Sequence, residues 1–157
     1  MILAGCGGRS QNTGMEAPPF TLKDLHGRSV SLADFKGHPI LMDFWATWCG
    51  PCRMSIPMVQ EFYKRHKKDG LVVLGLNIDD DPSSVYAFVQ HFGMTYPVLF
   101  AGGSGVPADY EVEGIPSFFI IDAEGRVVRH YEGFSEEMVD AWETELDHLL
   151  NSPAHQA

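Results

Sequence analysis

The sequence is poor in cysteine, in positive charge and in long apolar runs, and each shortage excludes a class of protein. Its 157 residues contain three cysteines, too few for a secreted scaffold in which dense disulfides replace a core. The net charge of −10 argues against nucleic acid as a partner, because phosphates would be repelled. No run reaches the roughly 18 apolar residues of a membrane-spanning helix. The length suits one domain with one core.

A metal site at the paired cysteines would also lack ligands. The seven histidines are scattered and none neighbours a cysteine. A zinc site on Cys49 and Cys52 would need a second ligand pair at recognisable spacing, and the sequence has none. Asp79-Asp80-Asp81 precedes Pro82 at an expected helix start, so we interpret this run as capping and not as a cation site. We therefore expect no metal and no other cofactor.

Apolar periodicity predicts an α/β sandwich with a mixed sheet. The expected order is a β-hairpin, then strand, helix, strand, helix and strand, and finally two antiparallel strands and a helix. In residue numbers the segments are 20–32 (hairpin), 39–46, 51–68, 71–79, 81–93, 96–100, 117–122, 126–133 and 135–150. Asp81 and Ser135 are the expected N-caps of the second and last helices. In the first helix, four residues are expected to face the core: Met54, Met58, Val59 and Phe62.

The stretch "ATWCGPCRMS" places Cys49 where a strand gives way to a helix. Unpaired N–H groups and the positive end of the helix dipole stabilise an anion there, so the Cys49 thiol should ionise easily and act as a nucleophile. Cys52 lies one turn further on, with Gly50 and Pro51 between them, and can close a disulfide back onto Cys49. The alternative is a structural staple, which stabilises poorly because so small a loop removes little entropy from the unfolded chain. This argument favours an exposed attacking thiol and a shielded resolving one.

"MDFWATWCGPC" resembles the active-site strand and motif of thioredoxins. The segments "APPFTLKDLHGRSVSLADFKGHPILMDFWATWCGPCR" and "YEVEGIPSFFIIDAEGRVV" resemble the TlpA/ResA-like branch, the tethered extracytoplasmic thioredoxins. The resemblance covers residues 16–151. It implies a thioredoxin fold, with a central mixed sheet flanked by helices and an N-terminal β-hairpin extension, and a thiol–disulfide oxidoreductase activity.

The resemblance also assigns roles to individual residues. It makes Cys49 the attacking thiol and Cys52 the resolving one, with Trp48 beside the nucleophile. Pro116, which follows Ile115 in "GIPSFF", matches the cis-proline that lies against the disulfide and helps to present backbone to the substrate. A further proline, Pro57, matches the one that kinks the active-site helix.

Asp43 interrupts an apolar strand six residues before Cys49, where thioredoxins have a buried aspartate. Burial would raise the pKa of this carboxyl and let it take the proton of Cys52; the alternative is an acid facing solvent. Many TlpA/ResA-like proteins carry a glutamate three residues after the second cysteine, and this chain has Ser55 there. The departure bears on the substrate, since cytochrome-maturation members often use that glutamate.

The first residues suggest a location. "LAGC", ending at Cys6, looks like a lipobox, and the glycine-rich stretch after it fits a tether, although only five residues precede the cysteine. The alternative is an unmodified, exposed thiol that can form dimers. We expect residues 1–15 to be a lipobox-like segment and flexible linker, residues 16–151 the thioredoxin-like domain, and residues 152–157 a tail. The expected place of action is outside the cytoplasm, with membrane contact only through that lipid.

The preferred interpretation is a reductant of protein disulfides, because the Gly-Pro dipeptide and Asp43 are shared with thioredoxins. It would need a membrane electron donor. One alternative is a reductant specific to cytochrome c maturation, with apocytochrome c as substrate. Another is a redox-inactive copper chaperone on the same fold, although copper-delivering relatives use a CxxxC pair. A peroxidase would need the PxxxTxxC pattern, which the sequence lacks.

Overall fold

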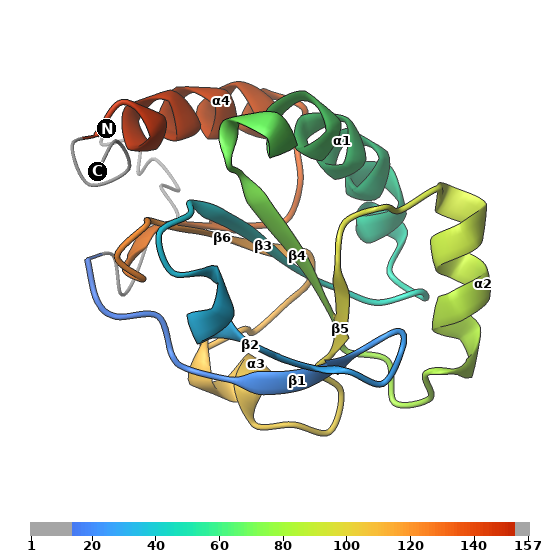
Figure 1. The fold of residues 1–157 in the computed structure, drawn as a ribbon. Coiled ribbons are helices and arrows are strands. Elements are labelled where there is room, and N and C mark those ends of the chain that lie inside the picture. The colour runs from blue at the N-terminus through green and yellow to red at the C-terminus, as the bar shows by residue number, and fades with distance from the viewer. Residues whose placement is uncertain (1–13, 153–157) are drawn as a thin grey trace, which may run out of the picture.

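A computed structural model describes residues 14–152, which form a seven-stranded mixed sheet with helices on both faces (Figure 1). The strand order is β2-β1-β5-β4-β3-β6-β7. The strands are β1 (Thr21–Asp24), β2 (Ser29–Ser31), β3 (Ile40–Trp45), β4 (Val72–Asn77), β5 (Val98–Phe100), β6 (Ser117–Ile121) and β7 (Val127–Glu132). The α-helices are α1 (Gly50–His66), α2 (Ser83–Phe92), α3 (Val106–Asp109) and α4 (Glu137–Leu150), and the 3-10 helices are η1 (Leu32–Phe35) and η2 (Lys67–Asp69).

The expected order of elements and the thioredoxin fold are confirmed, but two helix caps were predicted wrongly. Pro82 is the N-cap of α2; the Asp81 carboxylate still accepts the Ser83 N–H at 2.9 Å, because an aspartate readily bonds the backbone two residues on. At α4 the N-cap is Glu136 and has no side-chain hydrogen bond. Ser135 acts there through its carbonyl, which accepts the Met138 N–H at 3.1 Å.

Strand β3 is buried along its whole length because it lies in the interior of the sheet, between β4 and β6, and both faces are covered. It pairs in parallel with β4 and antiparallel with β6. Alternate side chains of a strand point to opposite faces, so Asp43 and Trp45 lie on one face and Met42 and Phe44 on the other. The single acid therefore belongs to the same layer as the following tryptophan.

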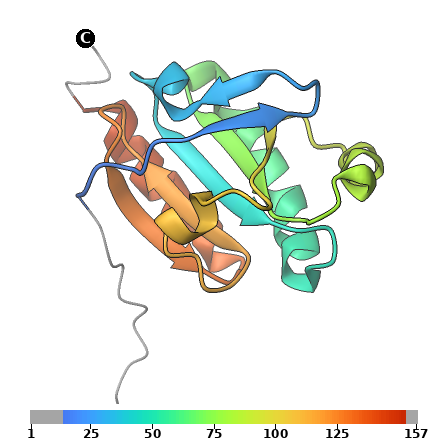
Figure 2. The ribbon, with the colours of Figure 1, turned by 90° about the horizontal axis from the view of Figure 1, so that it is seen from below.

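The two faces carry separate hydrophobic cores. Helices α1, α2 and α4 pack on the face of Trp45, and α1 and α4 lie side by side above the sheet in Figure 1. Their contact includes the rings of Phe62 and Trp142, with centroids 5.8 Å apart. The opposite core, around Phe44, is covered by residues from the N-terminal segment, η1 and α3 (Figure 2). We call these the helical face and the N-terminal face.

The phase of α1 differs from one part of the sequence-based prediction. Val59 and Phe62 are buried as expected, but Met54 is 70% exposed. The buried stripe of α1 runs through Cys52, Ile56, Val59 and Phe62, at the three- and four-residue spacing of a helix face, and Met54 falls outside it. Gly70, in the left-handed conformation (φ 99°), ends the following 3-10 turn.

No helix among residues 14–152 is long and apolar enough to cross a bilayer. Cys6 and most of the linker lie outside the described residues. The proposals about lipidation and tethering therefore rest on the sequence.

Candidate active site

The two cysteines of the CGPC motif lie at the mouth of α1, at the edge of the sheet where β3 and β4 end. Their sulfurs are joined in a disulfide, with Cα atoms 5.2 Å apart. Cys49 is the N-cap of α1, and its Sγ accepts the backbone N–H of Cys52 at 3.2 Å. Pro51 occupies the first turn, where a missing N–H is tolerated. A thiolate formed at Cys49 would meet one N–H donor and the positive end of a 17-residue helix.

Cys52 is more deeply buried than Cys49, as expected, but both cysteines are covered. Cys49 is 5% exposed and Cys52 is fully buried. The residue before the motif, Trp48, is 69% exposed. The sequence analysis expected Cys49 to be exposed, and in this disulfide form it is almost fully buried. A substrate would meet the rim of Cys49 beside a projecting tryptophan, and would have no direct route to Cys52.

The Ile115–Pro116 segment comes from 66 residues further along the chain and lies against the disulfide. Its peptide bond is cis, as the resemblance implied. The Ile115 carbonyl oxygen is 3.7 Å from Cys49 Sγ. Pro116 is buried, and its carbonyl accepts the Gly133 N–H at 2.8 Å, which ties this segment to the end of β7. The structure therefore brings Ile115 and Pro116 together with the CGPC motif.

Asp79 is a site residue that the sequence analysis missed. The run of aspartates was interpreted as capping, but the Asp79 carboxylate accepts the Thr47 N–H at 2.9 Å and the Thr47 hydroxyl at 2.6 Å. It also accepts a hydrogen bond from the Asn77 amide at 2.7 Å. Arg53 donates to the Thr47 carbonyl at 3.1 Å from the first turns of α1. These bonds hold the backbone just before Cys49, and no local pattern announces a contact that spans 32 residues.

Asp43 is fully buried, so the alternative of a solvent-facing acid is wrong. Loss of hydration raises the pKa of its carboxyl well above the ordinary value, because burial penalises the charged form. Neither carboxyl oxygen has a hydrogen-bond partner among the described residues. Asp43 lies in the same layer as Cys52. Its carboxyl therefore keeps its proton to a higher pH than an exposed aspartate does.

Ser55 and Pro57 shape the first turns of α1. Ser55, at the position where many TlpA/ResA-like proteins carry glutamate, is fully buried, and its hydroxyl donates to the Cys52 carbonyl at 3.1 Å. A glutamate side chain at this buried position would have to displace its neighbours. Pro57 lies inside the helix and cannot donate to the carbonyl four residues before it. The acid available beneath the disulfide is therefore Asp43.

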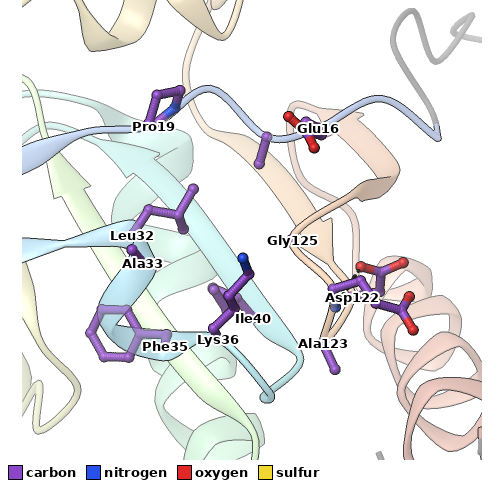
Figure 3. Close-up of a pocket in the computed structure, with 12 residues that line it drawn as sticks. Glu16, Pro19, Leu32, Ala33, Phe35, Lys36, Ile40, Asp122, Ala123 and Gly125 are labelled. Atoms are coloured by element: carbon purple, nitrogen blue, oxygen red, sulfur yellow. Dashed lines mark hydrogen bonds between the residues drawn. The ribbon is translucent and has the colours of Figure 1, made fainter. Parts of the chain in front are cut away.

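The described chain also has a pocket away from the disulfide (Figure 3). Its walls come from the N-terminal segment, η1, the first residue of β3 (Ile40) and the turn between β6 and β7. Cys49 comes four residues after Trp45, the last residue of β3, so this pocket lies at the other end of that strand. None of the candidate site residues lines it. Among residues 14–152 no group of three or more histidine, cysteine, aspartate or glutamate side chains is placed to hold a metal ion.

A CxxC disulfide at a helix mouth, a cis-proline against it and a buried acid below it, all on this mixed sheet, define a thioredoxin-fold thiol–disulfide oxidoreductase. The chain belongs to the Redoxin family, whose profile matches residues 12–146, and within it to the TlpA/ResA-like proteins. It is 36% identical over 120 residues to the thiol-disulfide oxidoreductase ResA of Bacillus anthracis, covering 76% of this chain and 69% of that protein. With ResA of Bacillus subtilis (strain 168) it shares 33% identity over 134 residues, 85% of this chain and 75% of that one.

Solved structures agree with this assignment. A Chlorobium tepidum protein assigned as the thiol:disulfide interchange protein DsbE superposes with a TM-score of 0.84 at 31% identity, over 91% of this chain and all of that one. A thioredoxin family thiol:disulfide interchange protein from Chlorobium tepidum TLS gives 0.77 at 26% identity, over 92% and 100% of the two chains. The chain is therefore a thiol–disulfide oxidoreductase with Cys49 and Cys52 as its dithiol pair.

Proposed function

We propose that this protein reduces disulfides of other proteins outside the cytoplasm. The observation that carries the proposal is the arrangement of Cys49 and Cys52: one sulfur at the rim of a helix N-terminus, the other fully buried behind it. A substrate disulfide can meet Cys49, while Cys52 is shielded from every sulfur except that of Cys49. This is the asymmetry that a two-step exchange requires.

The reaction transfers two electrons to the substrate. The Cys49 thiolate attacks one substrate sulfur, a Cys49–substrate bond forms, and the other substrate sulfur leaves as a thiolate. The Cys52 thiol then gives its proton to the Asp43 carboxylate, and the resulting thiolate attacks Cys49 Sγ. The Cys49–Cys52 disulfide forms, and the second substrate sulfur leaves. Asp43 suits this step because it is buried and its raised pKa brings proton exchange toward neutral pH.

The direction and the location rest on the motif and on the relatives. Gly50-Pro51 and the buried Asp43 are shared with thioredoxin, a reductant with a potential of about −270 mV. A reductant outside the cytoplasm needs a membrane donor of electrons, and lipidation of Cys6 would keep the domain near it. The buried Ser55 argues for general protein disulfides over a role restricted to apocytochrome c, because the glutamate often used in cytochrome maturation is missing.

A trapping experiment tests the proposal. In the Cys52→Ala variant the first attack proceeds and the mixed disulfide cannot be resolved, so substrate proteins should stay covalently attached to Cys49 in the native host. Cys49→Ala/Cys52→Ala is the matched control and should retain none of them. Purified wild-type protein should reduce insulin disulfides with a dithiol donor. Equal recovery from the single and double variants, together with no insulin reduction, would contradict the proposal.

The tether is tested separately. Mass spectrometry of the protein from native membranes should find a lipidated Cys6 as the first residue of the mature chain. Residues 6–15, the part of the lipobox-like segment and linker that remains in the mature chain, would then serve as anchor and linker for the domain at residues 16–151. A full-length precursor whose Cys6 stays unacylated in the native host would contradict the anchor but leave the exchange chemistry intact.

A further inference from the structure

Gly75, next to Asp43 in the sheet, leaves space that a tyrosine fills. Gly75 in β4 is paired in parallel register with Asp43 in β3, and residues paired in this way point to the same face. A Cβ atom built on Gly75 would lie 3.0 Å from Cε2 of Tyr96 and 3.0 Å from Nε1 of Trp45. The edge of the Tyr96 ring therefore occupies the side-chain position beside Asp43.

Tyr96 is held there by the fold. It precedes β5 and is 3% exposed. The next residue, Pro97, accepts the Gly75 N–H at its carbonyl, at 2.9 Å. The ring also makes an edge-on contact with Tyr63 of α1, with centroids 6.0 Å apart. The Tyr96 ring is thus held by β4 on one side and by α1 on the other.

Both polar groups of this pair are buried without a protein partner. The Tyr96 hydroxyl and the two Asp43 carboxyl oxygens have no hydrogen bond among the described residues. An unpaired buried polar group destabilises the folded state, so folded proteins rarely place two such groups close together. Trp45 Nε1 is a third unpaired atom in this layer. Its hydrogen is fixed by the ring, whereas the Tyr96 hydroxyl hydrogen rotates and can turn toward an acceptor.

Few titratable groups pack on the same face of the sheet as Asp43. The titratable groups packed on this face are Tyr96, Cys49 and Cys52 at the start of α1, and two half-buried tyrosines, Tyr63 of α1 and Tyr131 of β7. Strand β6 and helix α4 present the rings of Phe118 and Trp142, which do not titrate. No lysine, arginine or histidine is among the buried side chains of residues 14–152. Burial, and then the negative charge of Asp43, raise the pKa of Tyr96, so the two groups are electrostatically linked.

We propose that Tyr96 is a positioning residue for the resolving step: its hydroxyl donates a hydrogen bond to the ionised Asp43 carboxylate and so prepares it to take the proton of Cys52. The inference rests on the role proposed above for Asp43. In the disulfide form shown by the structure, Cys52 has no proton to give and the bond is not needed. When the dithiol is reduced, the hydroxyl stabilises the charged form of an acid that no buried cation supports.

The proposal predicts that removing the Tyr96 hydroxyl shifts the pH dependence of the resolving step. Without the hydroxyl, the ionised carboxylate loses its donor and its pKa rises, so a higher pH is needed before Asp43 can accept a proton. A hydrogen bond to a charged group corresponds to roughly one to two pH units. In Tyr96→Phe, the midpoint of the resolving step should move upward by about one pH unit, and its rate below the midpoint should fall about tenfold.

Stopped-flow reaction of the reduced protein with 5,5′-dithiobis(2-nitrobenzoate) measures the two steps separately. The first thionitrobenzoate released reports attack by Cys49, and the second reports resolution by Cys52. The second step is recorded from pH 5 to 10 for the wild type, Tyr96→Phe and the matched control Tyr63→Phe. The control removes a hydroxyl from the same cluster without altering the neighbour of Asp43, and its midpoint should match that of the wild type.

A second variant and a direct titration protect the test against misfolding. Gly75→Ala would press on the Tyr96 ring and should move the midpoint in the same direction. Infrared titration of the Asp43 carboxyl, assigned with Asp43→Asn, should show the same upward shift in Tyr96→Phe. Equal midpoints in Tyr96→Phe, Tyr63→Phe and wild type would overturn the inference. If the wild type itself releases no second thionitrobenzoate, the proposed dithiol cycle fails instead.

Discussion

Two buried tyrosines on opposite faces of the sheet have different surroundings. On the N-terminal face, the Tyr110 hydroxyl donates to the Pro18 carbonyl at 2.8 Å, and its ring packs against Phe44 and Phe119 with centroids 5.6 and 5.2 Å away. Burial, and to a lesser extent the charge of Asp109, raise the pKa of Tyr110 well above its ordinary value, so its hydroxyl stays a donor. On the helical face, Tyr96 has no such partner.

The same contrast extends to the other buried polar atoms. Most of those left without a partner among the described residues belong to the helical face, beneath the disulfide, and only one lies toward the N-terminal face. The helical-face atoms are Asp43 Oδ1 and Oδ2, Trp45 Nε1, Tyr96 OH and Trp142 Nε1, and the other is Nε2 of His130, which stacks on Phe119. Unpaired buried polar atoms lower stability. The N-terminal face therefore works as a frame, and the helical face accepts a loss of stability next to Asp43, the proposed proton acceptor.

The largest effect on stability is expected from a substitution on the N-terminal face. Phe44→Ala removes a fully buried ring that contacts Tyr110 and Phe119, and leaves a cavity between them. We expect a loss of about 3–5 kcal/mol in the free energy of unfolding. Urea unfolding of the oxidised protein measures it. A loss below about 1 kcal/mol would show that the N-terminal face tolerates cavities and is not the rigid half of the molecule.

The next effect depends on pH and belongs to Asp43. Its native pKa lies above the unfolded value, so at intermediate pH the native state holds a proton that the unfolded chain has released. The wild type is therefore fully stabilised below about pH 4 and loses about 1.4 kcal/mol per pH unit above it, until the native pKa is reached. Asp43→Asn carries no such proton, so its stability relative to wild type should increase with pH.

Urea unfolding of both oxidised proteins from pH 4 to 9 measures this difference. Asp80→Asn, at an exposed position in the same acidic run, is the matched control and should follow the wild type. A pH-independent difference between Asp43→Asn and wild type would mean that the carboxyl is charged in the native state across this range, contrary to the proposed exchange of its proton.

The smallest effect compares the two tyrosines directly. Tyr110→Phe breaks the bond to Pro18 and leaves a carbonyl oxygen unpaired, so it should cost about 1 kcal/mol. Tyr96→Phe removes an unpaired buried hydroxyl and should be neutral or slightly stabilising in the oxidised protein. Thermal unfolding of the two variants side by side tests the order. If Tyr96→Phe is the more destabilised, its hydroxyl has a structural partner and the contrast between the faces is lost.

Local patterns were sufficient for much of this protein. The strand and helix order follows from apolar periodicity and turn residues, and the resemblance of the CGPC and GIPSFF stretches identified the dithiol pair and the cis-proline. The N-caps predicted at Asp81 and Ser135 were each missed by one residue, because a polar residue just outside a helix can still bond its first turn, Asp81 through its carboxylate and Ser135 through its carbonyl. Met54 was misplaced because a methionine at helical spacing can lie on either side of the buried stripe.

Asp79 and Tyr96 could not be found in this way. Asp79 meets Thr47 across 32 residues, and the Tyr96 ring lies against Gly75, which is paired with Asp43 in the sheet. No spacing in the sequence predicts either contact, because both depend on how the strands pair. A buried tyrosine near a strand is otherwise ordinary core.

By itself the sequence determined the chemistry: two thiols one helical turn apart, a helix start beside the first, and an acid within an apolar strand. These features depend on residues that lie close together in the sequence, so the local sequence is sufficient to predict them. Only the tertiary structure decided that both sulfurs are covered, that the Ile115 carbonyl lies against Cys49, and that the Tyr96 ring lies against Gly75, the strand neighbour of Asp43. Burial and register come from the packing of distant segments, and the proton affinity of a buried acid depends on the neighbours that this packing supplies.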